Sequence, residues 1–266
     1  MNLTIATWNI NSLRLRQALL HQLAAELAPD IICLQETKVP DELFPEAIAG
    51  ALGMPYVLKR GMKGYNGVAI LSRLPLTLAE DTPDWCGKGD CRHISAIVQA
   101  GGAPLTLHNF YVPAGGDIPD RNENPKFGHK LDFLAETEAH FRASPPARAI
   151  LVGDLNIAPL EHDVWSHKQL LNIVSHTPIE VKGLNAWMAA GWYDALRHFV
   201  PPEQKLYTWW SYRNRDWAAS DRGRRLDHVW VTPDLKPGLQ SYQLLRAARD
   251  WEQPSDHVPV AVTLSL

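Results

Sequence analysis

The stretch Ala149-Ile150-Leu151-Val152-Gly153-Asp154-Leu155-Asn156-Ile157-Ala158-Pro159 places polar side chains directly after a run of apolar ones. The run Ala149–Val152 is short and aliphatic, which predicts a buried β-strand. Asp154 and Asn156 follow the end of this strand, where they could simply form a turn through their side-chain hydrogen bonds. The same order, an apolar strand with polar residues at its end, recurs on both sides of this stretch.

Polar residues stand at the ends of five further predicted strands. They are Asn9 in Leu3–Asn9, Glu36 after Ile31–Gln35, Tyr111 in Pro104–Val112, Asp227 in Leu226–Thr232, and Asp256 before His257–Leu264. Any one of them could be a solvated turn residue or a cap at the start of a strand. Six such ends in one chain favour a common rim, because catalytic residues gather on loops held by a rigid scaffold.

The remaining pattern alternates strands with helices. Further strands are predicted at Gly67–Ser72 and His93–Gln99, and helices from Asn11 or Ser12 to about Leu27 and at Pro40–Leu52, Phe127–Arg142 and Ile179–Ala190. Strands outnumber helices and short turns link several of them, so we expect an α/β protein with mixed or antiparallel sheets and helices outside. No repeat or linker-like tract divides the chain, so residues 1–266 are expected to form a single domain.

Composition limits the partners and the compartment. The chain has 266 residues, three cysteines and a net charge of −3, which argues against binding nucleic acid through overall basicity but allows a local basic face. The cysteines lack zinc-finger spacing, which is typical of reduced thiols in a cytosolic protein. No signal peptide opens the sequence, and no apolar run approaches the ~20 residues that span a bilayer. We therefore expect a cytoplasmic protein that does not engage membranes.

The polar strand ends suit metal-assisted hydrolysis. Asn9, Glu36 and Asp256 supply the hard oxygen ligands that Mg²⁺ prefers, and this ion usually takes only one or two carboxylates. If His257 pairs with Asp227, the carboxylate would fix the imidazole tautomer and raise its basicity. The sequence lacks the Gly-x-Ser-x-Gly signature of acyl transfer, the Walker phosphate loop and the glycine fingerprint of dinucleotide binding.

Five segments in chain order resemble the motif set of the exonuclease III family of abasic-site (AP) endonucleases, within the endonuclease/exonuclease/phosphatase superfamily. They are Trp8-Asn9-Ile10-Asn11, Leu34-Gln35-Glu36-Thr37-Lys38, Gly153–Pro159, Arg225-Leu226-Asp227 and Ser255-Asp256-His257. The last motif occurs across the superfamily, whereas the second and third together are specific to its DNA repair branch. The resemblance implies a four-layer α/β sandwich of the DNase I-like type, with two sheets flanked by helices.

The resemblance also implies an activity. It predicts a Mg²⁺-dependent nuclease, with Mn²⁺ as a substitute, that hydrolyses the phosphodiester 5′ to abasic sites. It further predicts processing of 3′ ends, as a 3′–5′ exonuclease and as a 3′-phosphatase or phosphodiesterase. The partner would be double-stranded DNA with abasic sites or with damaged or recessed 3′ ends, bound by a monomer. Such catalysis consists mostly of positioning and of neutralising charge on the phosphoryl oxygens.

The resemblance assigns a metal-binding set with Glu36 as the principal magnesium ligand. The full set is Asn9, Glu36, Asp154, Asn156, Asp256 and His257. A bound metal ion can polarise the phosphate, lower the pKa of a water or stabilise the leaving 3′ oxygen. Whether one ion or two bind stays open.

The resemblance also assigns catalytic roles. Asp154 would orient or deprotonate the attacking water, Asn156 would hold the scissile phosphate, and Tyr111 would lie close to that phosphate. His257, oriented by Asp227, would contact a phosphate oxygen and stabilise the developing negative charge. Asp154, Tyr111 and His257 each remain candidates for the general base.

Aromatic and basic residues occur together in the stretch Tyr207–Arg215, and three arginines follow at 222, 224 and 225. Arginines can clamp phosphates while aromatic rings stack against exposed sugar or base, although a solvated loop with two core tryptophans would read similarly. By resemblance, Trp209 and Leu226 would line an apolar pocket for an extruded abasic sugar, whose extrusion costs little stacking. The predicted DNA contacts are Arg92, Lys126, Trp209, Arg213, Arg224 and Leu226.

Two segments depart from the family pattern. Gly115-Gly116 alters the loop after Tyr111, and Trp165–Glu180 differs in a region that should lie near the DNA lesion. Within the second segment, small Ser175 would leave room for a flipped sugar, whereas His176 could obstruct it. The balance between abasic-site incision and 3′-end processing therefore stays open.

Two other functions remain to be weighed. One is a phosphatase or lipid phosphodiesterase of the same superfamily, against which the arginine–aromatic loop counts. The other is a catalytically silent DNA-binding module. A silent module should have lost some of the chemical residues, yet the sequence retains Glu36, Asp154, Asn156 and His257.

Overall fold

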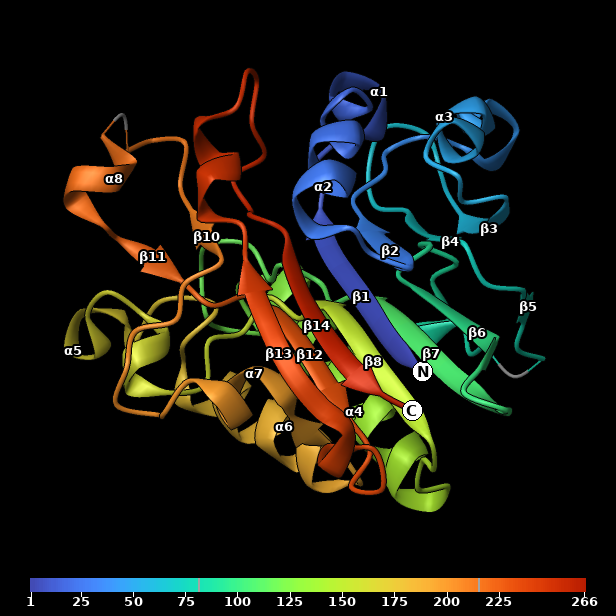
Figure 1. Cartoon of the computed structure of the whole chain (residues 1–266). Helices are drawn as coiled ribbons and strands as arrows, with labels where there is room; N and C mark the ends of the chain where they lie inside the picture. The colour runs from blue at the N-terminus through green and yellow to red at the C-terminus, as the bar shows by residue number, and fades with distance from the viewer. Residues whose placement is uncertain (81, 215) are drawn as a thin grey trace.

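Two six-stranded sheets form the centre of the protein (Figure 1). The computed structural model describes residues 1–80, 82–214 and 216–266. In spatial order, the first sheet contains β13 (Leu239–Leu244), β14 (Val260–Ser265), β1 (Asn2–Asn9), β2 (Ile31–Gln35), β4 (Val68–Ser72) and β3 (Tyr56–Arg60). The second contains β5 (Leu76–Leu78), β6 (His93–Ala100), β7 (Ala103–Tyr111), β8 (Ala149–Asp154), β12 (Asp227–Val231) and β9 (Tyr193–Asp194).

Each sheet is mixed and contains one parallel pair at its centre. These pairs are β1 with β2 and β7 with β8, and the other paired strands of the two sheets run antiparallel. A small antiparallel ribbon of β10 (Trp209–Trp210) and β11 (Gly223–Arg224) stands beside the sandwich. Because parallel strands end at the same edge, the two central pairs bring four strand ends together.

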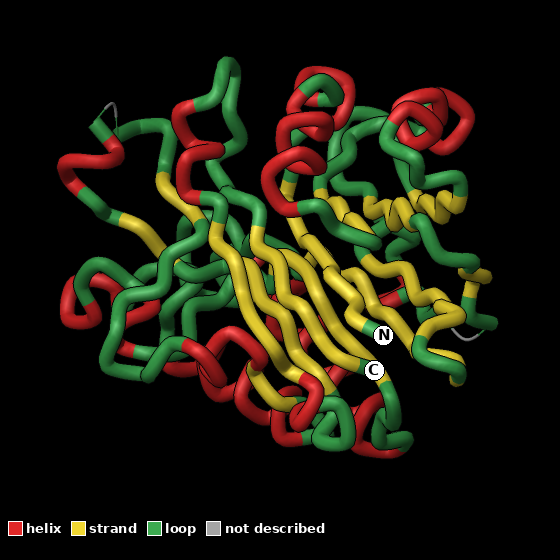
Figure 2. Tube along the Cα trace, in the orientation of Figure 1, coloured by secondary structure: helices red, strands yellow, loops and turns green. Residues whose placement is uncertain are grey.

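Helices cover the outer faces of both sheets, as Figure 2 shows. On the first sheet lie α1 (Leu13–Arg16), α2 (Leu19–Leu27) and α3 (Glu46–Ala51), and on the second lie α4 (Pro125–Ala143) and α6 (Pro178–Ala189). Shorter helices are α5 (His167–Leu170), α7 (Ala195–Phe199) and α8 (Trp217–Ser220). Single 3₁₀ turns occur at Asp41–Leu43, Trp85–Gly87, Glu161–Asp163, Lys236–Gly238 and Arg246–Asp250.

The strand residues alternate between two cores. In β1, Leu3 and Ile5 face the second sheet in the central core, whereas Ala6 and Trp8 face α2 and α3. All four side chains are completely buried, because the sheet is covered on both faces. A third core of aromatic and aliphatic residues joins the second sheet to α4 and α6. The result is a four-layer α/β/β/α sandwich, which confirms the predicted fold class.

The predicted helix from about residue 11 to Leu27 is wrong in its continuity. It is divided into α1 and α2, and Leu20 N donates to Gln17 O, a three-residue spacing that interrupts the α-helical ladder. Ser12 does not cap α1 through its side chain and has a φ of 91°. The break coincides with Arg16, whose buried guanidinium leaves the helix surface to donate to Ile10 O and Gln253 O.

Two more boundaries differ from the prediction, and proline lies at each. Pro45 separates a 3₁₀ turn from α3, so Pro40–Leu52 is not one helix, since the residue before a proline is driven to extended geometry. The last strand begins at Val260 rather than at His257, because Pro259 has no N–H to offer a ladder. His257 therefore lies on the loop before β14, where it forms an isolated bridge with Trp209.

Within the described part of the chain, every helix is too short or too polar to traverse a lipid bilayer.

Candidate active site

Strand ends from both sheets meet at one edge of the sandwich. Asn9, the last residue of β1, pairs with Gln35, the last residue of β2. In the second sheet, Tyr111 ends β7 and pairs with Asp154, which ends β8. Asp227 opens the antiparallel β12 directly opposite Asp154. The register of the sheets thus places Asp154 between Tyr111 and Asp227.

Asn9 links the two sheets at this edge. Its side-chain nitrogen donates to Glu36 Oε1 at 2.9 Å and to Asp154 Oδ2 at 2.8 Å. Its side-chain oxygen accepts the backbone N–H of Asn11 at 3.1 Å. The side chain is completely buried, so Asn9 acts here as a donor that orients both carboxylates.

Glu36 collects three donors. Besides Asn9, the Tyr111 hydroxyl donates to Oε1 and the Lys38 ammonium lies beside Oε2, each at 2.8 Å. Burial alone would raise the pKa of Glu36, but the Lys38 charge and the hydrogen bonds from Asn9, Lys38 and Tyr111 hold that pKa below its ordinary value. Glu36 is therefore ionised, as a ligand of a hard cation must be.

Asn11 links Lys38, the ion-pair partner of Glu36, to Asp256. From the sequence, Asn11 was predicted only as a helix cap and as part of a motif. Lys38 Nζ donates to Asn11 Oδ1 at 2.6 Å, and Asn11 Nδ2 donates to Asp256 Oδ1 at 3.1 Å. The other oxygen of Asp256 accepts from Trp209 Nε1 at 2.9 Å. The signal in the sequence was its position two residues after Asn9, on the same loop out of β1.

Asp154 is buried and has an unusual proton affinity. Oδ2 accepts from Asn9 and from Asn156 Nδ2, and Oδ1 accepts the backbone N–H of Asn156 at 3.0 Å. Burial raises the pKa of Asp154 to about 7, although the charge of His257 opposes this rise. A carboxyl group with a pKa near neutrality can exchange a proton with water at the pH at which an enzyme works.

His257 is a cation at this site. Its Nδ1 donates to Asp227 Oδ2 at 2.8 Å, and the Thr208 hydroxyl donates to the same oxygen at 2.6 Å. Burial alone would lower the pKa of His257, but the carboxylates of Asp227 and Asp154 outweigh it and raise that pKa to about 10. Nε2 lies 3.6 Å from Asp154 Oδ2, which is an ionic contact too long for a hydrogen bond.

Tyr111 is a neutral donor. Burial and the nearby carboxylates of Glu36 and Asp154 raise the pKa of its phenol well above the ordinary value. A phenol that stays protonated at neutral pH cannot serve as a base there. Of the three candidates for the general base, the geometry and proton affinities favour Asp154.

Two groups of side chains could hold a metal ion. Asp154, Asp227 and His257 bring ligand atoms within 4.8 Å of one another, but His257 Nδ1 and Asp227 Oδ2 are already joined by a hydrogen bond. Glu36 and Asp256 instead line the pocket as carboxylates with amide and ammonium neighbours. Carboxylates are the ligands that a hard divalent cation prefers, so Glu36 and Asp256 fit better.

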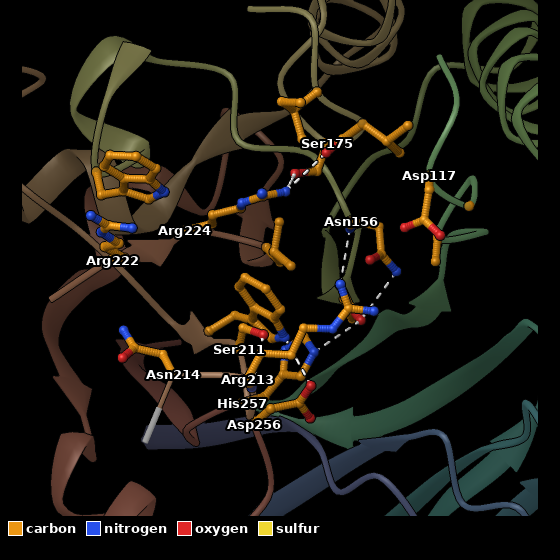
Figure 3. A pocket seen from close by; sticks show the side chains of 18 of the residues that line it. Asp117, Asn156, Ser175, Ser211, Arg213, Asn214, Arg222, Arg224, Asp256 and His257 are labelled. Carbon is orange, nitrogen blue, oxygen red and sulfur yellow. Dashed lines mark hydrogen bonds and ion pairs between the residues drawn. The ribbon is translucent and has the colours of Figure 1, made fainter. Parts of the chain in front are cut away.

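A pocket of about 910 Å³ opens over these groups (Figure 3). Its lining contains the acidic residues and His257, and also three arginines, Arg213, Arg222 and Arg224. Figure 3 shows Arg222 and Arg224 on the side away from Asp256 and His257. Arg222 and Arg224 therefore offer cationic groups on the wall opposite the hydrolytic centre, whereas Figure 3 shows Arg213 beside Asp256 and His257.

Aromatic rings hold two of these arginines in place. The Arg224 guanidinium lies 5.3 Å from the Trp209 ring centre, and its Nη1 donates to Ser175 Oγ at 2.7 Å. Arg222 lies 4.8 Å from the Trp165 ring centre. Four of the six predicted DNA contacts line the pocket, namely Trp209, Arg213, Arg224 and Leu226.

The other two predicted contacts lie apart from the pocket lining. Arg92 packs over the Tyr111 ring at 4.9 Å and pairs with Asp90, whereas Lys126 is exposed in the first turn of α4. Arg215, in the predicted arginine–aromatic stretch, lies outside the described residues.

The departing segment Trp165–Glu180 supplies part of the pocket wall. Ser175 lines the pocket, but the imidazole of His176 is buried and donates to Ala158 O at 2.6 Å. Its other nitrogen lies 2.8 Å from His167 Nδ1. His176 is thus engaged behind the wall and is not among the described residues that line the pocket.

Known proteins share both the sequence pattern and the fold. Residues 6–257 match the Endonuclease/Exonuclease/phosphatase family. The chain is 30% identical to exodeoxyribonuclease III of Haemophilus influenzae, with 96% of this chain and 97% of the relative covered. An AP endonuclease from Archaeoglobus fulgidus superimposes with a TM-score of 0.90 at 32% identity, over 99% of this chain and all of that one.

A second solved structure extends the likeness to another activity. A 3′ phosphatase from Neisseria, bound to a product DNA hairpin, superimposes with a TM-score of 0.89 at 30% identity, over 99% of this chain and 100% of that chain. These likenesses cover nearly the whole chain and agree with the five motifs. This chain therefore belongs to the Endonuclease/Exonuclease/phosphatase family, in its exonuclease III branch of metal-dependent DNA repair nucleases.

Proposed function

We propose that this nuclease hydrolyses phosphodiesters of double-stranded DNA on the 5′ side of abasic sites and at damaged or recessed 3′ ends, with Mg²⁺ as its metal ion. The observation that carries the proposal is the contact between the proton-accepting Asp154 and the cationic His257 inside an arginine-lined pocket. We further propose that residues 1–266 act as one domain and as a monomer in the cytoplasm, and that Mn²⁺ can replace Mg²⁺.

The proposed reaction divides the work between Asp154 and His257. Asp154 takes a proton from the water that attacks phosphorus, and the bond between phosphorus and the 3′ oxygen breaks, with its electron pair going to the 3′ oxygen, which takes a proton from solvent water. The His257 imidazolium, held by Asp227, lies close enough to balance the charge that grows on a phosphoryl oxygen. Asn156 Nδ2 donates to Asp154 Oδ2 and to Val112 O at 2.9 Å, so it would contact the phosphate by exchanging one of these bonds.

A divalent ion at Glu36 and Asp256 would supply Lewis-acid stabilisation of the phosphate or of the leaving oxygen. The protein's own part is to keep Glu36 ionised and to hold both carboxylates in place. Asn9, Asn11 and Lys38 do this through the hydrogen bonds described above. Asn9, Asp154 and Asn156 remain proposed members of the wider metal set, and His257 would join it only after losing its proton.

The other wall of the pocket would hold the DNA. Arg222 and Arg224 there, with Arg213 beside the hydrolytic centre, provide positive charge for the backbone, and Trp209 provides an aromatic face for an exposed sugar or base. Because His176 is turned away and Ser175 is small, the wall leaves space for an abasic deoxyribose. Arg92 and Lys126 would contact DNA outside the pocket.

A panel of duplexes tests the proposal directly. Substrates carry one tetrahydrofuran abasic analogue, a 3′-phosphate or a recessed 3′ hydroxyl, and each is incubated with Mg²⁺, with Mn²⁺ or with a chelator. We expect a nick 5′ to the analogue, release of phosphate and shortening of the recessed strand, all abolished by the chelator. Products are resolved on denaturing gels.

Two controls define what would contradict the proposal. An intact duplex without a lesion or a recessed end should stay uncut. A phosphoinositide and an inositol phosphate are assayed in parallel, because the same superfamily contains phosphatases and lipid phosphodiesterases. Much faster hydrolysis of either than of DNA would reject the repair assignment, as would the absence of any Mg²⁺-dependent nick.

Asp227→Asn is expected to lower the proton affinity of His257. Without the Asp227 carboxylate, burial is opposed mainly by Asp154, so the pKa of His257 falls below about 10. The folded protein then loses its imidazolium as pH rises through the lowered pKa, so that kcat at pH 8 falls on the order of 10²-fold. NMR titration of the His257 imidazole measures the shift, and an unchanged pKa would contradict the pairing.

A further inference from the structure

A buried ion pair lies behind the pocket. Lys130 on α4 and Glu180 on α6 are completely buried, and Lys130 Nζ lies 2.5 Å from Glu180 Oε1. Taking two charges out of water is costly, and well-packed apolar residues of similar volume often stabilise a fold as well as such a pair. Stability alone is therefore a weak explanation for the pair, and its other contacts point to a different role.

Lys130 reaches two loops of the pocket wall. Its ammonium donates to Asn156 O at 2.8 Å and to Ala114 O at 3.3 Å. Both of these residues line the pocket. With Glu180 as its third partner, the ammonium uses all of its donors, so the loops after β7 and β8 are tied to one point.

Glu180 holds the third loop. Its two oxygens accept the backbone N–H of Ser175 at 2.9 and 3.0 Å, and Oε2 accepts the Thr177 N–H at 3.2 Å and hydroxyl at 2.6 Å. Ser175 in turn accepts the hydrogen bond from Arg224 on its hydroxyl. Glu180 therefore fixes the part of the wall on which Arg224 rests.

The residues held by the two partners share an uncommon backbone conformation. Asn156 has a φ of 55° and Ser175 a φ of 84°, both in the left-handed region that non-glycine residues rarely occupy. Such residues persist only where the surrounding structure holds them in place. Lys130 bonds to the carbonyl of the first and Glu180 to the amide of the second, so each charge restrains one strained pocket residue.

We propose that Lys130 and Glu180 are positioning residues for the nuclease reaction, which together set the phosphate contact of Asn156 and the wall formed by Ser175 and Arg224. Neither residue touches substrate, and the pair acts through the backbone of the two loops. This role rests on the proposed function of the pocket. The ion pair couples the loop of Asn156 to the wall formed by Ser175 and Arg224, so that a shift of either one displaces the other.

The test compares Lys130→Met, Glu180→Leu and the double variant that carries both. Each single variant leaves one buried charge without its partner, whereas the double variant replaces the pair with apolar side chains. Asp132→Asn is the matched control. Asp132 lies on the same helix as Lys130, and the substitution breaks only its exposed ion pair with Arg121. The measurements are kcat and KM on the abasic and 3′-phosphate duplexes, the thermal midpoint, and hydrogen exchange of the Ser175 and Thr177 amides.

We expect the double variant to keep its thermal midpoint close to that of the wild type but to lose about 10- to 100-fold in kcat, because small displacements of positioned groups are costly. KM should change less than kcat, and the amides of Ser175 and Thr177 should exchange faster. The Asp132→Asn control should retain kcat within about twofold, as is usual for exposed ion pairs.

Three results would overturn the proposal. The first is a folded double variant with wild-type kcat. The second is a kcat that is low in the single variants and rises in the double variant in step with the thermal midpoint, which indicates a merely structural pair. The third is a double variant that does not fold, since the pair would then be required for the fold itself. If the wild type cleaves none of the duplexes, the proposed function fails, whereas the amide exchange still shows whether the pair holds the loop.

Discussion

Glu36→Ala is expected to reduce Mg²⁺-dependent cleavage of the abasic duplex by about 10³-fold, since a bound metal contributes several kcal/mol to stabilising the transition state. Glu36 is the carboxylate on which Asn9, Lys38 and Tyr111 converge, so its loss leaves all three donors without their acceptor. The cleavage rate is measured over a range of Mg²⁺ concentrations. The concentration for half-maximal rate should rise, and DNA affinity in chelator should be unchanged or higher, because a negative charge is lost.

Glu123→Ala is the matched control for this variant. Glu123 is an exposed carboxylate outside the pocket lining, so its removal changes the net charge equally and should leave the rate and the Mg²⁺ dependence as they are. If Glu36→Ala cleaved as fast as this control at low Mg²⁺, the metal would have to bind elsewhere. Asp154, Asp227 and His257 would then be the group to examine.

Asp154→Asn should lower kcat by about 10²- to 10⁴-fold, which is the usual contribution of a general base. The substitution keeps the size of the side chain but removes the group whose pKa burial raises to about 7. KM should change little, because Asn156 and the arginines still hold the DNA. Single-turnover cleavage of the abasic duplex separates this chemical step from product release.

Two comparisons make that test decisive. Asp117→Asn removes the same charge from an exposed position in the same pocket and should leave kcat nearly unchanged. Tyr111→Phe should cost less than Asp154→Asn, because the Tyr111 phenol stays protonated and serves only as a donor to Glu36. The reverse order of the two effects would move the role of base from Asp154 to Tyr111.

The strand ends could be predicted because local sequence determines them. Apolar runs such as Ile31–Gln35 and Ala149–Val152 can bury both faces, and a polar residue placed after such a run has to lie at the edge of the sheet. The antiparallel edge strand Leu239–Leu244 was missed, because its residues alternate between half-buried and exposed positions without a clear apolar run. An edge strand depends on its partner more than on its own composition.

The candidate site was predictable in its members but less so in their connections. The roles of Asn11 and of the Lys130–Glu180 pair depend on hydrogen bonds between segments that the chain brings together only after folding. Lys130 and Glu180 also look like ordinary charged positions on helices, which are mostly exposed. Protonation states likewise depend on burial and on neighbouring charges, which the sequence does not show. The general base could therefore not be chosen from the sequence among Asp154, Tyr111 and His257.

The strand that comes last in the chain, β14, is not at an edge but between β13 and β1 inside the first sheet. It is preceded by Asp256 and His257, which complete a site whose other members lie on the first and middle parts of the chain. A nascent chain that has not yet released β14 from the ribosome lacks the strand partner on one side of β1 and has no imidazolium beside Asp154. The order of strands in the sheet thus means that the first sheet and the site are complete only after β14 has been synthesised.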